Sequence, residues 1–163
     1  YQNVYGPGQS LSNPYTGILS IFSTRILNGN DLDIYEDGEE TRDFVYIEDA
    51  VDATILGMEK EEANGNIFNV GSGVSTRVLD VANTLKRLYN SEINITVSGK
   101  FRLGDIRHNF ADLSKSKDIL GFTPKYNFER GITEFVNWVK TQEVMEDKYE
   151  KSIQQLKNKG LIK

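Results

Sequence analysis

The sequence has no cysteine and only one histidine in 163 residues. Without thiols the chain can form neither a disulfide nor a thiolate metal site, and it has no cysteine nucleophile. A single imidazole is also too few for a zinc or iron centre made of protein ligands. We therefore expect no metal site and no thiol chemistry.

Long apolar runs and an excess of positive charge are missing as well. No run approaches the roughly 18 apolar residues that a membrane-spanning helix requires, and no secretory signal is visible. The formal net charge is −5, whereas nucleic-acid-binding domains usually carry a basic face. These absences predict a cytoplasmic protein that binds neither membranes nor nucleic acids. The composition, 38% hydrophobic and 26% charged, is ordinary for a globular domain.

Apolar residues recur at helical spacing in several parts of the chain, which predicts amphipathic helices. Asn28-Gly29 indicates the end of the first helix, Gly121 closes a short one, and Asn127 is a cap for the helix that follows. Ser75 or Thr76 is a candidate cap for another. The predicted helical segments are 18–26, 47–58, 78–88, 112–121 and 128–139, with a weakly amphipathic one after Glu143.

Short β-rich segments alternate with these helices. The chain opens on a strand-like run, YQNVY, that breaks at Gly6-Pro7-Gly8, and Asn13-Pro14 indicates a turn. Asp37-Gly38 lies between two β-rich segments and predicts a two-residue hairpin. IFNV (67–70) and INITV (93–97) are further predicted strands. The sequence therefore predicts a mixed α/β fold with several short strands.

Gly71 and Gly73 lie between the predicted strand 67–70 and a helix, as the glycines of a dinucleotide-binding turn do. The third glycine position holds Thr76, and no second strand ending in an acidic residue follows at the expected distance. We therefore interpret this segment as a tight loop that leads into a capped helix, and a dinucleotide site here is the weaker alternative.

Arg42, in the segment ETRDFV, has two interpretations. If Asp37-Gly38 closes a strict two-residue hairpin, Arg42 faces Asp33 across the hairpin and the two form a cross-strand ion pair. Alternatively, the guanidinium binds a phosphate through two parallel hydrogen bonds. Spacing alone slightly favours the ion pair.

The segment GKFRLGDIRHNFAD places several cationic side chains around Gly104-Asp105. Within an acidic protein such a cluster attracts anions locally, and Asp105 can accept hydrogen bonds from sugar hydroxyls. The alternative is a solvated loop with internal salt bridges, and composition does not decide between them. We interpret His108 as a structural or surface residue. The cationic residues are Lys100, Arg102, Arg107 and His108.

Five stretches, in this order, resemble the C-terminal half of the NAD-dependent sugar-nucleotide epimerases and dehydratases of the extended short-chain dehydrogenase/reductase family. They are YQNVYGPGQ, NPYTGILSIFSTRILNG, IYEDGEETRDFVYIEDA, NIFNVGSG and RLGDIRHNFADLSKSKDILGFTP. The resemblance is greatest to UDP-glucose 4-epimerase-like and dTDP-sugar 4-epimerase-like members. The resemblance covers residues 1–140, which we expect to be the substrate-binding portion, and leaves 141–163 as a charged helical tail.

The resemblance implies a fold made of the last strands of a Rossmann-type sheet plus a small mixed α/β substrate-binding domain. In this family an N-terminal part holds NAD on a glycine-rich turn and carries a Tyr-x-x-x-Lys pair. This chain has neither motif, so we expect an inactive fragment without catalytic residues that does not bind NAD alone. The parent would bind a UDP- or dTDP-sugar and act through a 4-keto intermediate, with NAD as hydride acceptor.

The resemblance also assigns site residues, each at its matching position. Tyr1 corresponds to the residue beside the nicotinamide. Asn3, Arg42 and Arg102 correspond to groups that bind the substrate diphosphate. Asp33 and Tyr35 correspond to residues that border the base, and Asp105 corresponds to one that contacts the diphosphate and the ribose. Arg107 receives no role.

A second interpretation is a stand-alone domain that binds a nucleotide sugar or another protein and has no catalytic activity. An upstream coding sequence with a glycine-rich turn would favour the first interpretation, and a start codon near Tyr1 the second. The fragment interpretation also predicts that Val4 and the strand 67–70 lie at the edge of an incomplete sheet. Such an edge would pair with the missing half or promote self-association.

Overall fold

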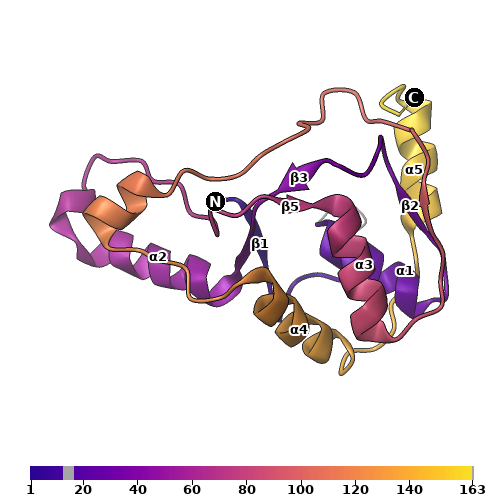
Figure 1. Cartoon of the computed structure of the whole chain (residues 1–163), viewed down its shortest axis with the longest axis horizontal. Helices are drawn as coiled ribbons and strands as arrows, with labels where there is room; N and C mark the ends of the chain where they lie inside the picture. Colours follow the sequence, from indigo (N-terminus) through magenta and orange to yellow (C-terminus); the bar gives the residue numbers. More distant parts are fainter. Residues whose placement is uncertain (13–16, 163) are drawn as a thin grey trace.

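A computed structural model describes residues 1–12 and 17–162 as a mixed α/β fold (Figure 1). The turn expected at Asn13-Pro14 lies outside the described residues. The elements in chain order are β1 (Asn3–Tyr5), α1 (Ile18–Leu27), β2 (Leu32–Ile34), β3 (Thr41–Arg42), β4 (Phe44–Tyr46), α2 (Ile47–Glu59), the 3-10 turn η1 (Glu61–Ala63), β5 (Thr76–Arg77), α3 (Val78–Tyr89), β6 (Ile95–Val97), the π-helical turn η2 (Ser116–Leu120), α4 (Phe128–Val139) and α5 (Tyr149–Asn158).

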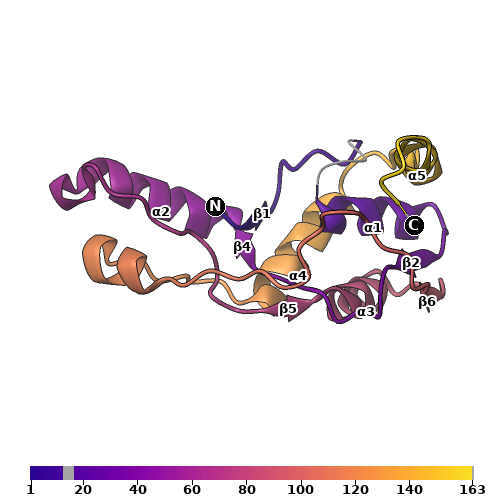
Figure 2. The same cartoon turned by 90° about the horizontal axis from the view of Figure 1, so that it is seen from above.

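The strands form three two-stranded sheets. β1 pairs with β4 in parallel, β2 with β6 in parallel, and β3 with β5 antiparallel. In both views α2 and η2 lie at one end of the molecule and α1, α3 and α5 at the other, with α4 and the β1–β4 pair between them (Figures 1 and 2). None of the helices in the described ranges has the length and apolar character needed to cross a bilayer.

Strand β4 separates two hydrophobic clusters because successive side chains of a strand point to opposite faces. Phe44 and Tyr46 belong to the larger cluster, and Val45, which is fully buried, belongs to the smaller one. The larger cluster is built from α1, α3 and α4, with Leu19, Phe22, Val81, Leu85, Ile132 and Phe135 among its members. The smaller joins α2 to η2 through Ala50, Ala53, Leu120 and Phe122.

Several helix ends lie where local residues predict them. Helix α1 ends at Asn28, and Gly29 follows with a φ of +71°. The Asn127 side chain accepts a hydrogen bond from the backbone N–H of Arg130 at the start of α4. Gly121 ends η2 in the left-handed conformation, and Phe122 behind it is buried. The cap predicted for α3 is wrong, because Arg77 occupies that position and makes no side-chain cap hydrogen bond.

Gly131, in the interior of α4, lets this helix pack directly on the β1–β4 pair. A Cβ at this position would lie 2.2 Å from the Tyr5 hydroxyl and 3.1 Å from a ring carbon of Tyr46. Glycine destabilises a helix interior by about 1 kcal/mol relative to alanine. Here the close approach of helix and strands explains its presence.

The predicted hairpin at Asp37-Gly38 does not form. The chain does turn there, with the Gly38 N–H donating to the Tyr35 carbonyl over 3.1 Å, but β2 and β3 pair with other strands. A two-residue type I′ turn needs positive φ at two consecutive residues, whereas here Glu36 and Gly38 have positive φ and Asp37 between them does not. The flanking strands therefore diverge.

The predicted strand at 67–70 is also absent. The backbone from Asn66 to Val70 forms no regular element, and Ile67 is exposed to 87%. A backbone hydrogen bond from Gln2 to the Val70 carbonyl, 2.8 Å long, connects the segment to the residue before β1. Of the two segments expected at the sheet edge, only the one containing Val4 is a strand, β1, and it forms no ladder with residues 67–70.

Helix α2 forms as predicted but buries a different face. Its buried residues are Asp49, Ala50 and Ala53, whereas Val51, Ile55 and Met58 are exposed to 47%, 45% and 81%. This exposed apolar stripe is the kind of surface that the self-association prediction requires. Self-association itself stays a prediction.

Candidate functional site

A cleft of about 320 Å³ opens between α1, the β2 strand with its following turn, β3, the loop after β6, and α5. Its lining includes every residue that the resemblance assigned to the substrate. These residues are Asn3, Asp33, Tyr35, Arg42, Arg102 and Asp105. Tyr1 is not among the lining residues; it is 70% exposed, and its hydroxyl lies 2.7 Å from the Thr54 hydroxyl of α2.

Arg42 is held in a fixed orientation at the cleft wall. Its Nη1 donates to the carbonyls of Thr41 and Arg107 over 2.8 and 3.1 Å, and Nη2 donates to Asp105 Oδ1 over 2.9 Å. The side chain is 19% exposed. Since a guanidinium has five N–H donors in a rigid plane, three are satisfied internally and two remain for a ligand.

The cross-strand ion pair between Arg42 and Asp33 is not formed. Asp33 pairs with Lys100, whose Nζ lies 2.7 Å from Asp33 Oδ2. The reason is the missing hairpin, because β2 and β3 are not neighbours in any sheet. Arg42 instead pairs with Asp105, which lies 63 residues further along the chain.

Arg102 is the less restrained of the two arginines. Its guanidinium carbon lies 5.6 Å from the centre of the Tyr35 ring, within the range of a cation–π contact. Among residues 1–12 and 17–162, no carboxylate lies within ion-pair distance of it. The cleft therefore contains a cation without an anionic partner from the described chain.

Asp43 was missed by the sequence reasoning, yet it organises the floor beneath Asn3. Its carboxylate is fully buried and accepts hydrogen bonds from the backbone of Ser72 (2.6 Å), Gly73 (2.9 Å) and Ala111 (3.1 Å) and from the Ser72 hydroxyl (2.6 Å). Its carbonyl accepts from both the backbone and the side chain of Asn3, each over 3.0 Å. No local spacing signal marks such a residue, because its partners lie far along the chain.

The glycine loop at 71–73 thus wraps a carboxylate of its own chain. A Cβ on Gly71 would lie 2.4 Å from Asp43 Oδ2, so glycine is needed there for close approach. The backbone N–H groups of Ser72 and Gly73, which would point at a pyrophosphate in a dinucleotide turn, already donate to Asp43. The loop therefore supports the interpretation as a tight connection and not as a cofactor turn.

Two carboxylate oxygens at the cleft have no hydrogen-bond donor within the described part of the chain. They are Asp33 Oδ1 and Glu40 Oε1. Glu40 is 7% exposed, and burial raises its pKa above the ordinary value. Both oxygens can accept hydrogen bonds from a ligand, and Glu40 was not singled out from the sequence.

Arg107, which received no role from the sequence, neutralises an acidic cluster beside the cleft. Its guanidinium donates to Glu36 over 2.5 Å and to Asp37 over 2.6 Å. Glu36 and Asp37 lie close enough to Glu40 to form a candidate cation site. Because Arg107 already supplies the positive charge, we assign no metal to it. His108 has a structural contact, with Nδ1 lying 3.1 Å from the Thr41 hydroxyl.

A sequence profile of the NAD dependent epimerase/dehydratase family matches residues 1–71. The chain is 44% identical over 138 residues to a dTDP-L-rhamnose 4-epimerase of Burkholderia thailandensis, covering 85% of this chain and 38% of that protein. It is 31% identical to a UDP-glucose 4-epimerase of Mycolicibacterium smegmatis, over 86% of this chain and 44% of that protein. The chain thus spans less than half the length of these relatives.

Solved structures of sugar-nucleotide epimerases are also similar to this chain. A UDP-glucose 4-epimerase of Thermotoga maritima, determined with UDP-glucose, superposes with a TM-score of 0.77 and 36% identity, over 86% of this chain and 44% of that one. A UDP-N-acetylglucosamine 4-epimerase of Methanobrevibacter ruminantium, in complex with UDP-N-acetylmuramic acid, gives a TM-score of 0.79 and 34% identity, over 88% and 45%. The similarity extends well beyond the 71 residues of the profile.

Proposed function

Because the chain belongs to the NAD-dependent epimerase/dehydratase family, we propose that it is the sugar-nucleotide-binding part of an enzyme that acts on a UDP- or dTDP-sugar. The fold class expected from the sequence, part of a Rossmann-type extended short-chain dehydrogenase/reductase, is confirmed by the solved relatives. The observation that carries the proposal is the single cleft lined by all six assigned residues.

In this proposal the diphosphate binds between Arg42 and Arg102. Arg42 is pre-oriented by its bonds to two backbone carbonyls, and Arg102 contributes a charge that has no carboxylate partner in the described ranges. Asn3 lies on the same wall and adds an amide. Two cations within an acidic chain favour a doubly charged ligand locally, even though the whole molecule is negative.

The remaining assigned residues would position the nucleoside. Asp105 shares a hydrogen bond with Arg42 and is 46% exposed at its side chain, so it can accept from ribose hydroxyls. Asp33 lies on β2, and Tyr35 is the first residue after this strand. Asp33 Oδ1 has no donor in the described chain. A base N–H would satisfy this oxygen.

The chemistry of the parent enzyme, oxidation of the sugar at C4, would be supplied by NAD as hydride acceptor. Among the described residues, the glycine loop does not offer its amides to that cofactor, since the N–H groups of Ser72 and Gly73 donate to Asp43. We therefore derive no catalytic step here. We place NAD binding and the catalytic pair in a part of the parent outside this chain, which leaves this chain without turnover by itself.

Calorimetric titration with UDP and dTDP tests the proposal. Arg42→Ala and Arg102→Ala should each weaken binding about 10- to 100-fold, because a hydrogen bond to a charged group contributes about 1.5–3 kcal/mol. Arg87→Ala is the matched control, since Arg87 pairs with Glu129 outside the cleft. Absence of UDP and dTDP binding, or equal effects of all three variants, would overturn the proposal.

A stand-alone binding domain without catalysis would give the same titrations. The two interpretations differ once the chain is combined with an NAD-binding half from a relative. Epimerase or dehydratase turnover by that reconstituted pair supports the enzyme interpretation, whereas nucleotide binding without turnover supports the stand-alone domain.

A further inference from the structure

The C-terminal helix α5 forms one wall of the cleft. Tyr149, at its first position, and Leu156, two turns later, both line the cavity. Ser152 and Ile153 on the same helix are buried against the rest of the molecule, at 5% and 7% exposure. The segment from Glu143 onward, expected from the sequence to be a charged tail, is therefore part of the site.

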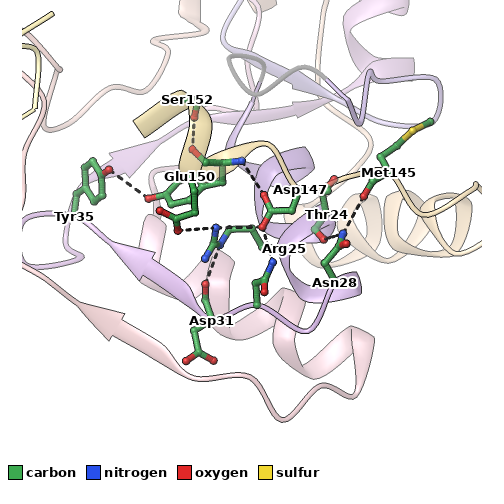
Figure 3. Close-up of polar contacts among 11 residues, drawn as sticks. Thr24, Arg25, Asn28, Asp31, Tyr35, Met145, Asp147, Glu150 and Ser152 are labelled. Atoms are coloured by element: carbon green, nitrogen blue, oxygen red, sulfur yellow. Dashed lines mark hydrogen bonds and ion pairs between the residues drawn. The ribbon is translucent and has the colours of Figure 1, made fainter. Parts of the chain in front are cut away.

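A buried ion pair fixes the start of this helix (Figure 3). Arg25 of α1 donates to Asp147 over 3.2 Å, and both side chains are only 10% exposed. The Arg25 guanidinium also lies 4.2 Å from the centre of the Tyr149 ring, and its Nε donates to the Asp31 carbonyl over 2.9 Å. Breaking the Arg25–Asp147 pair would leave an uncompensated buried charge, which is costly. The pair therefore holds Arg25 in position, and Arg25 in turn contacts the Tyr149 ring.

A second attachment joins the end of the chain to the arginine loop. Ile162, which is 9% exposed, pairs with Arg102 in an isolated antiparallel bridge, and the Leu103 N–H donates to the Leu161 carbonyl over 3.0 Å. The backbone that carries Arg102 is thus bound to the residues that follow α5.

Tyr149 also contacts the residue that we place beside the base. Its hydroxyl donates to the Tyr35 hydroxyl over 3.3 Å (Figure 3). The Tyr149 hydroxyl is the donor of this pair. The proton of Tyr35 is then free to be donated to a ligand.

We propose that Tyr149 is a binding residue that contacts the nucleoside of the bound nucleotide, with Arg25, Asp147 and the Ile162 bridge as its supports. The inference rests on the proposed function and adds to it a wall that the six assigned residues do not supply. An aromatic ring presents a face for stacking a base, and such contacts typically contribute about 5- to 150-fold in affinity per base. The diphosphate, bound between the arginines, should be insensitive to this residue.

Titrations with UDP and with inorganic pyrophosphate separate contacts to the nucleoside from contacts to the diphosphate. Tyr149→Ala should weaken UDP binding by about tenfold and leave pyrophosphate binding within about twofold. Tyr149→Phe keeps the ring on Arg25, and with it the docked helix, and should weaken UDP binding by about threefold through the lost Tyr35 contact. Gln154→Ala, on an exposed position of the same helix, is the control and should change neither affinity.

Amide hydrogen exchange of the wild-type chain gives an independent result that involves no variant. UDP should slow exchange in residues 149–158, and pyrophosphate should not. If UDP binds and depends on Arg42, yet both tyrosine variants bind it normally or exchange in α5 is unchanged, this inference is wrong and the proposed function survives. If wild-type protein binds neither UDP nor dTDP, both fail.

Discussion

Replacing the carboxylate of Asp43 is the most direct test of how this fold holds its cleft. In Asp43→Asn an amide nitrogen takes the place of one oxygen. If it replaces Oδ2, the N–H groups of Gly73 and Ala111 lose their acceptor. If it replaces Oδ1, the backbone N–H of Ser72 loses its acceptor, while the Ser72 hydroxyl can turn to accept from the amide. The second orientation is the less costly one.

The expected loss follows from these contacts. At least one charge-assisted hydrogen bond disappears, worth about 1.5–3 kcal/mol, and the remaining bonds lose their charge. We therefore expect Asp43→Asn to lower the free energy of unfolding by about 3 kcal/mol. For a chain of this size that corresponds to a fall in melting temperature of roughly 6–12 °C.

Urea denaturation followed by circular dichroism measures the loss, with calorimetry for the melting temperature. Asp112→Asn is the matched control, because Asp112 is exposed and its carboxylate accepts, among the described residues, only from Ser114 two residues on; it should cost about 0.5 kcal/mol or less. UDP affinity of Asp43→Asn should also fall, since losing the side-chain hydrogen bonds loosens the backbone whose carbonyl accepts from Asn3. A loss of stability below about 1 kcal/mol would refute the account of the glycine loop as a carboxylate cradle.

Two further predictions concern Glu40 and α2. Burial raises the pKa of Glu40, so its contribution to stability is fully present below the ordinary value of 4.5 and is lost as pH rises through the raised value. Glu40→Gln should therefore stabilise the chain at pH 7.5, and urea denaturation at pH 4 should show the gain vanish; a gain independent of pH would contradict this. The exposed apolar stripe of α2 should cause self-association, which light scattering measures and which Val51→Lys with Met58→Lys should reduce. A wild-type chain that stays monomeric at high concentration would count against it.

The helices could be predicted because their signals are local. Asn127 and Gly121 lie next to the elements they bound, and the apolar spacing of α1 and α4 is contained within each segment. Strand pairing was not predictable in the same way. β3 pairs with β5, which begins at Thr76, and β2 pairs with β6, which begins at Ile95. A strong local turn signal at Asp37-Gly38 therefore predicted a hairpin that the long-range partners prevent.

The residues of the site likewise differ in whether the sequence marks them. Arg42 and Arg102 were found through a resemblance that assigns positions directly, and the fold brings them into one cleft. Glu40 and Tyr149 carry no such mark. Glu40 lies in a charged turn that looks solvated in the sequence, and Tyr149 lies in a lysine- and glutamate-rich segment whose position over the cleft depends on the buried Arg25–Asp147 pair. Only tertiary packing reveals them.

Strand β4 passes into α2 without an intervening residue, and Asp43 alone separates β4 from β3. From Arg42 to Glu59 the backbone therefore has no flexible joint. The Arg42 guanidinium lies at one end of this segment, and the exposed apolar stripe of α2 lies along the other. A contact made on that stripe is therefore connected to the arginine of the cleft by continuous strand and helix backbone, interrupted only at the buried Asp43.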